Sequence, residues 1–116
     1  MRTIVTNNVL VREKASGARV LHVLGSAAAV YVTARDMIHQ GWVLGSHPLT
    51  GGVSAASQPY RSLLMEPGDG PVSCRSLALI EAALHRMTPG HPSVEHDPDY
   101  QWLDYELSRD WGGDLA

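Results

Sequence analysis

Short apolar runs alternate with helical patterns along this chain, and no other feature constrains its fold as strongly. Runs rich in apolar and β-branched residues lie at 3–6, 19–24, 42–44 and 61–66. Such alternation is typical of β-α-β units, in which helices connect parallel strands and cover the sheet. The sequence therefore predicts an α/β fold, a small three-layer domain of the Rossmann-like or flavodoxin-like kind, with about four mostly parallel strands and helices on both faces.

The clearest helical pattern lies between Ser26 and Gly41. Its apolar side chains recur with the spacing of one face of an α-helix. They are Ala27, Val30, Tyr31, Ala34, Met37 and Ile38. Ser26 is a favourable N-cap residue, and Gly41 can adopt the backbone conformation that ends a helix. Further helices are predicted over 9–16, 74–87 and 99–110.

Charge divides the chain into two parts. Residues 1–94 carry eight basic and five acidic residues, a net charge of +3, whereas residues 95–116 carry one basic and seven acidic residues, a net charge of −6. We predict a core domain over 1–90 and, over 91–116, an acidic linker followed by a helix that packs on the core or extends from it. The apolar side chains expected to hold that helix against the core are Trp102, Leu103 and Leu107.

Composition argues against several classes of function. The net charge is −3 and basic residues do not cluster, so no nucleic-acid partner is expected. Apolar runs fall short of the ~20 residues that cross a bilayer, and the N-terminal run is too short for a signal peptide, so we expect no membrane association and a cytoplasmic location. The single cysteine, Cys74, excludes an intrachain disulfide and a two-cysteine redox pair. The chain lacks the glycine-rich nucleotide-binding motifs, and we expect no cofactor.

Polar residues follow three of the predicted strands, at the place where ligands bind in open parallel sheets. The turns are Thr6-Asn7-Asn8, Gly25-Ser26 and 45–52. Together they indicate a pocket for a small anionic metabolite, although turns between strands and helices also need caps and glycines simply to fold. The candidate ligand-binding residues are Thr6, Asn7, Asn8, Ser26, Ser46, His47, Gly51, Gly52 and Tyr60.

The segment 46–60 is the strongest candidate for the functional surface. It is longer than the ~4–6 residues of common connections, and long loops without their own secondary structure are often functional. His47 lies in this loop, where it can act as an acid, a base or an anion contact, or can simply bond neighbouring backbone. The pairing of His47 with His39 matches no known metal-ligand spacing, so no metal is expected.

Five motifs stand out between residues 4 and 81. They are Ile4-Val5-Thr6-Asn7-Asn8, Arg35 to Gly41, Ser46-His47-Pro48-Leu49-Thr50-Gly51-Gly52, Pro59-Tyr60-Arg61-Ser62, and Ser76-Leu77 with Ile80-Glu81. Together they resemble the GrdX family, small proteins encoded beside components of glycine, sarcosine and betaine reductases. The resemblance implies an accessory protein associated with glycine reductase, rather than a catalytic subunit.

Three functions are compatible with the sequence. The first is a non-catalytic accessory protein that binds a small ligand or a partner subunit through the 46–60 loop. The second is a small enzyme that uses His47 as an acid or base on a small anionic metabolite. In the third, the acidic C-terminal segment docks on a protein partner, and a homodimer is also compatible with the small size of the domain. The resemblance favours the first.

Overall fold

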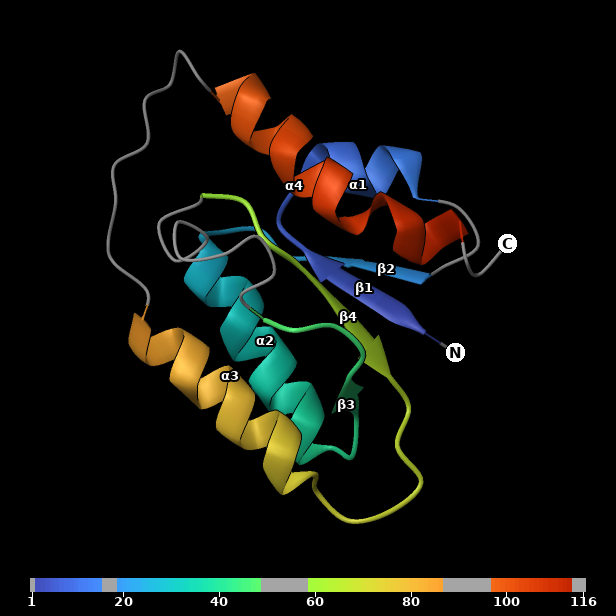
Figure 1. The fold of residues 1–116 in the computed structure, drawn as a ribbon, viewed down its shortest axis with the longest axis vertical. Coiled ribbons are helices and arrows are strands. Elements are labelled where there is room, and N and C mark those ends of the chain that lie inside the picture. The colour runs from blue at the N-terminus through green and yellow to red at the C-terminus, as the bar shows by residue number, and fades with distance from the viewer. Residues whose placement is uncertain (1, 16–18, 49–58, 87–96, 114–116) are drawn as a thin grey trace.

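The computed structural model of the protein describes residues 2–15, 19–48, 59–86 and 97–113. In chain order the elements are β1 (Thr3–Thr6), α1 (Val9–Lys14), β2 (Arg19–His22), α2 (Ala27–His39), β3 (Val43–Leu44), β4 (Ser62–Glu66), α3 (Cys74–Arg86) and α4 (Asp97–Gly113). Four strands and four helices confirm the predicted α/β class (Figure 1).

The four strands form one mixed sheet in the order β2-β1-β4-β3. β1 is parallel to β2, whereas β4 is antiparallel to both of its neighbours, with Thr6 opposite Ser62 and Leu44 opposite Met65. The expected sheet of mostly parallel strands is therefore not found, and a Rossmann-like or flavodoxin-like arrangement is not confirmed.

The direction of β4 has a physical reason in the segment before it. Parallel neighbours need a crossover connection, usually a helix, whereas antiparallel neighbours do not. The segment between β3 and β4 has no apolar periodicity of a helix. After β3 the chain continues along β4, where the Gly45 amide donates to the Leu64 carbonyl oxygen at 2.7 Å. The lack of helical periodicity in the sequence of this segment was thus the signal for an antiparallel pair.

Apolar side chains leave the central strands on both faces, so each face has its own core. Val5, Leu63 and Met65 pack with the apolar faces of α2 and α3. Ile4 and Leu64, their neighbours in sequence, pack on the other face with a side chain of α1. Figure 1 shows α2 and α3 together on one side of the sheet and α1 with α4 on the other.

α2 begins and ends where its sequence predicts. The Ser26 hydroxyl accepts a hydrogen bond from the Ala29 amide at 3.4 Å, as an N-cap does. At the other end Gly41 has a φ of 105°, and its amide donates to the Ile38 carbonyl oxygen at 3.0 Å. All six side chains of the predicted apolar face are buried. This helix therefore provides a fixed support for one face of the sheet.

α4 packs against α1 and β4, but through an unexpected face. Its inward residues include Asp104 and Ser108, which are buried, whereas Trp102 is 52% exposed and Leu103 is 46% exposed. The prediction that Trp102 and Leu103 hold this helix to the core is therefore wrong. The third predicted contact, Leu107, is half-buried. Asp104 instead accepts hydrogen bonds from polar side chains of the core, which are described below.

Candidate functional site

The turns that follow β1, β2 and β3 gather at one edge of the sheet. β1, β2 and β3 point the same way, because β4 is antiparallel to both β1 and β3. The first two turns are in direct contact, since Asn7 Nδ2 donates to the Gly25 carbonyl oxygen at 3.1 Å. The third reaches this edge through Pro48, whose carbonyl oxygen accepts from Arg61 Nη2 at 3.0 Å. The edge predicted for the site is thus assembled, although the sheet is mixed.

The Asn7 side chain ties three segments together at this edge. Besides Gly25, its Nδ2 donates to the Pro59 carbonyl oxygen at 3.0 Å. Its Oδ1 accepts from the Arg61 amide at 3.0 Å. The amide group can make two donor bonds, and both go to backbone carbonyls of this chain. The Asn7 side chain is therefore committed to the architecture of the edge.

A second set of hydrogen bonds surrounds Arg61, which is only 2% exposed. Its Nε donates to the Tyr31 hydroxyl at 3.1 Å, and that hydroxyl donates to the Pro48 carbonyl oxygen at 2.6 Å. Burial raises the pKa of Tyr31, and the neighbouring Arg61 charge opposes part of that rise. A buried cation and a buried phenol thus fix Pro48, the residue that follows His47.

A third set of hydrogen bonds lies at the same edge, on the opposite face of the sheet. Asn8 Nδ2 donates to the Gln101 carbonyl oxygen at 2.8 Å and to Asp104 Oδ2 at 3.0 Å. Ser62 Oγ donates to Asp104 Oδ2 at 2.7 Å and lies 2.7 Å from Thr6 Oγ1. Asn8 also caps α1, because its side chain accepts from the backbone of that helix. These contacts join β1 and β4 to α4.

Asp104 is an acidic side chain in a buried position. Burial raises the pKa of its carboxyl above 3.8, while hydrogen bonds from Asn8 and Ser62 and the Arg61 charge oppose that rise. Both hydrogen bonds end on the same oxygen, Oδ2. A protonated carboxyl can therefore keep both of them with its proton on Oδ1.

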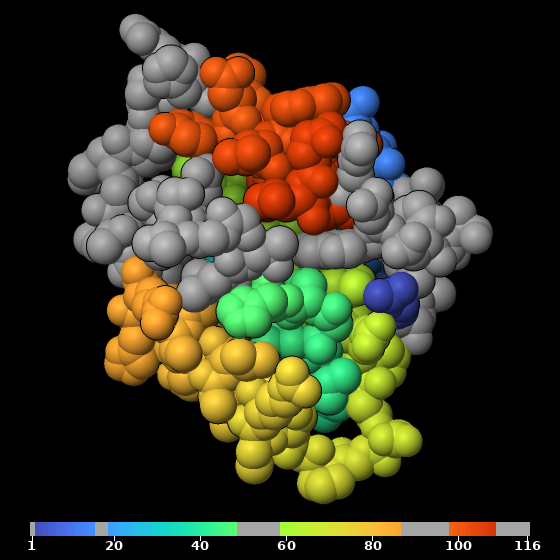
Figure 2. All heavy atoms as spheres, viewed as in Figure 1, coloured from blue at the N-terminus to red at the C-terminus, as the bar shows by residue number. Residues whose placement is uncertain are grey.

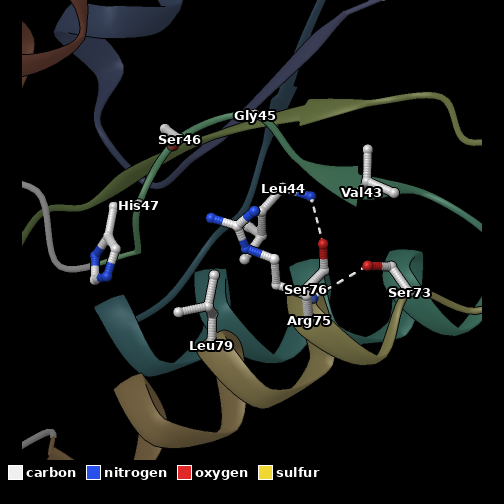
Figure 3. A pocket seen from close by; sticks show the side chains of 9 residues that line it. All are labelled: Val43, Leu44, Gly45, Ser46, His47, Ser73, Arg75, Ser76 and Leu79. Atoms are coloured by element: carbon white, nitrogen blue, oxygen red, sulfur yellow. Dashed lines mark hydrogen bonds between the residues drawn. The ribbon is translucent and has the colours of Figure 1, made fainter.

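A cavity of about 420 Å³ opens between the 43–47 segment and the beginning of α3. Its lining residues are Val43, Leu44, Gly45, Ser46, His47, Ser73, Arg75, Ser76 and Leu79. This volume is within the ~300–1,000 Å³ of small-molecule sites. Figure 2 shows the 43–48 segment (green) beside α3 (yellow to orange) on the molecular surface. In Figure 3 the Arg75 side chain extends from α3 toward the segment that carries Ser46 and His47.

Serine hydroxyls hold the walls of this cavity in place. Ser76 Oγ accepts from the Leu44 amide at 3.1 Å and so joins α3 to β3. Ser46 Oγ accepts from the Leu64 amide at 3.1 Å, and Ser73 Oγ caps α3 by accepting from the Ser76 amide at 3.2 Å. Each hydroxyl oxygen accepts a backbone proton, and each hydroxyl can donate its own proton to a further acceptor.

The nine predicted site residues occupy different settings. Those that line the cavity are Ser46 and His47. Those that are buried in internal hydrogen bonds are Thr6, Asn7 and Asn8. Those that lie outside the described residues are Gly51 and Gly52. Ser26 is exposed at the start of α2, and the half-buried Tyr60 accepts from Gln101 Nε2 at 3.4 Å through its hydroxyl.

Sequence reasoning did not single out four residues that shape this region. Arg61 and Ser62 belong to a motif quoted above, so a signal for them was present. Asp104 lies among the seven acidic residues of 95–116, and nothing in the sequence marks it as buried. Arg75 lies in the first turn of α3, where the helix dipole favours acidic residues. A basic residue at this position is a weak sequence signal for a functional cation.

Other features of the described residues bear on the chemistry available to them. These residues contain no group of three or more His, Cys, Asp or Glu side chains that could hold a metal ion. Cys74 is exposed and takes part in no disulfide among them. None of the helices found there combines the length and the apolar character that crossing a bilayer requires.

Comparisons with known proteins place the chain in a family. Searches of curated proteins and of solved structures found no match. A family model described as GrdX-like protein matches residues 3–110. The match extends beyond the motifs of residues 4–81 and includes most of α4, with Asp104. The chain therefore belongs to the GrdX-like protein family.

Proposed function

We propose that this protein is a non-catalytic accessory protein that binds a small ligand or a partner subunit through the 46–60 segment and the neighbouring strand ends. The observation that carries the proposal is the cavity of about 420 Å³ that has Ser46 and His47 in its wall. Membership in the GrdX-like family supports the accessory role. An association with glycine reductase components and a cytoplasmic location are parts of the same proposal.

The walls of the cavity are held in a way that suits binding. Arg61 and Tyr31 fix the backbone at Pro48, at one end of the cavity wall. Ser76 fixes β3 against α3 at the other. A site whose walls are already ordered loses less conformational entropy when a ligand or partner binds. These internal hydrogen bonds thus favour recognition by the cavity.

Binding is a better account than catalysis because of where the perturbed ionisable groups lie. Groups with strongly shifted pKa values in a cleft are typical of active sites. Burial raises the pKa of Asp104 and of Tyr31, yet neither residue lines the cavity. An enzyme built on this cavity would have to use His47 as its acid or base. In that case His47→Ala would abolish turnover and leave the melting temperature nearly unchanged.

A thermal-shift screen tests the proposal. Amino acids, short carboxylates, phosphates and nucleotides form the ligand set, and a ligand at ~100 times its Kd adds ~2.7 kcal/mol to the free energy of unfolding. For a chain of this size that corresponds to a rise of about 10 °C. The double variant Ser46→Ala/His47→Ala should lose the shift, whereas His39→Ala, an exposed histidine at the end of α2, should keep it. Absence of any shift, together with pull-downs that do not distinguish wild type from the double variant, refutes the proposal.

A further inference from the structure

We propose that the cavity beside β3 binds a small organic anion, with its carboxylate or phosphate group at Arg75 and its apolar body against Leu44 and Leu79. The inference rests on the proposed function and specifies its ligand. It follows from the charge, the hydroxyl groups and the size of the cavity.

The first argument is the charge of Arg75, which pairs with no carboxylate among the described residues. In the part of the chain that the structure describes, salt bridges join Arg2 to Glu66 and Arg35 to Glu81, and Arg75 takes part in neither. Among the described residues no acidic side chain lines the cavity, and the first turn of α3 contains none. Arg75 is exposed, so its guanidinium is accessible from solvent and can take an anion from outside. Its planar fork of donors matches carboxylate and phosphate groups.

The second argument is the hydroxyl groups that line the same cavity. Ser73 and Ser46 contribute hydroxyl groups to the same walls (Figure 3). Hydroxyl groups donate hydrogen bonds to anionic oxygens. The walls thus offer hydroxyl donors in addition to the guanidinium.

The third argument is size. A water molecule occupies ~30 Å³ in the liquid, so a cavity of about 420 Å³ has room for much more than a single head group. The remaining wall includes the apolar side chains of Val43, Leu44 and Leu79. Burial of methylene groups against such a wall is favourable. The ligand that fits is an organic anion with an apolar part, rather than an inorganic ion.

A homologous ligand series tests this inference on the full chain. Acetate, butanoate, hexanoate and butyl phosphate are titrated into ¹⁵N-labelled protein, with hexanamide as the uncharged match for hexanoate. We expect saturable shifts of the backbone amides in 44–47 and 73–76. The affinity for the carboxylates should rise about threefold for each added methylene, and hexanamide should bind at least about tenfold more weakly than hexanoate.

Matched variants locate the head group. Arg75→Gln should weaken hexanoate binding about tenfold or more, and Arg75→Lys should weaken it less, because a point charge remains. Arg12→Gln, an exposed arginine on α1, should change nothing. Ser73→Asp keeps an N-cap for α3 but places a negative charge in the wall, so it should abolish binding, whereas the neutral cap Ser73→Asn should not.

Three results would overturn the inference: no saturable shift at the cavity amides, equal binding of hexanamide and hexanoate, or unchanged affinity in Arg75→Gln. If a neutral compound binds at the cavity and the Ser46→Ala/His47→Ala variant loses it, the anion specificity fails while the proposed function stands. If neither charged nor neutral compounds nor a partner engage this segment, both fail.

Discussion

Replacing Asp104 with alanine tests whether polar contacts hold α4 to the core. Asp104 Oδ2 accepts from Asn8 Nδ2 at 3.0 Å and from Ser62 Oγ at 2.7 Å. Alanine deprives both buried donors of this acceptor, at about 1–3 kcal/mol each. We expect the free energy of unfolding to fall by about 3 kcal/mol. The melting temperature should fall by about 12 °C.

The pH dependence of the free energy of unfolding is a second, independent test of the burial of the Asp104 carboxyl. Because burial raises the pKa of Asp104 above 3.8, the folded protein binds this proton more tightly than the unfolded chain does. The resulting stabilisation is complete below the unfolded-state pKa and is lost as pH rises through the folded-state pKa. Asp104→Asn keeps the shape and an acceptor oxygen but cannot titrate. The free energy of unfolding of wild type, relative to this variant, should therefore decrease as pH rises.

Urea unfolding followed by far-UV circular dichroism between about pH 4 and pH 8 measures both effects. Leu103→Ala is the contrast within α4, since Leu103 is 46% exposed and its loss should cost less than about 1 kcal/mol. The reasoning is refuted if Asp104→Ala costs no more than Leu103→Ala. It is also refuted if the difference between wild type and Asp104→Asn does not change with pH.

Further predictions concern the edge of the sheet, and thermal or urea unfolding checks each of them. Tyr31→Phe removes the hydroxyl that donates to Pro48 at 2.6 Å and should lower the free energy of unfolding by about 1–2 kcal/mol; an unchanged value would show that this bond contributes nothing. Gly25→Ala should cost about 1–3 kcal/mol, because Gly25 has a φ of 143° and an added Cβ would lie 3.3 Å from Ala29 Cβ. Asn7→Ala should cost about 2 kcal/mol, since it removes bonds to three backbone groups, and a neutral effect would remove Asn7 from the architecture of the edge.

Local features of the fold could be predicted from the sequence, whereas the pairing of β4 with β1 could not. The bounds of α2 follow from its apolar spacing and its caps, Ser26 and Gly41, which act within the helix itself. Apolar runs locate the strands equally well. The place of β4 in the sheet depends on pairing with Thr3–Thr6, more than fifty residues earlier in the chain, as the separation of 56 between Thr6 and Ser62 shows. Apolar alternation carries no information about such pairing.

The turns after β1, β2 and β3 were predicted to lie together and do so, whereas their role as a binding site stays a prediction. The rule that ligands bind at the carboxyl ends of strands located the turns, because β3 runs parallel to β1 even though β4 lies between them. The turn residues Asn7 and Asn8 are polar in the sequence, but polarity alone does not distinguish a ligand contact from an internal one. Asn8 meets Asp104 across a separation of 96 residues, which only the folded chain reveals.

The adjacent residues Asn7 and Asn8 help to fix the register of β1 in the sheet. One amide reaches the Gly25 turn, and the next reaches α4 on the other face. Side chains alternate along an extended strand, and a slip by a single position would put Thr6 in the place of Asn7 or Val9 in the place of Asn8. Two chemically identical side chains thus have different partners because adjacent residues face opposite sides of the sheet. A one-residue insertion before Asn7 should consequently disturb the contacts of both asparagines, with the Gly25 turn and with α4.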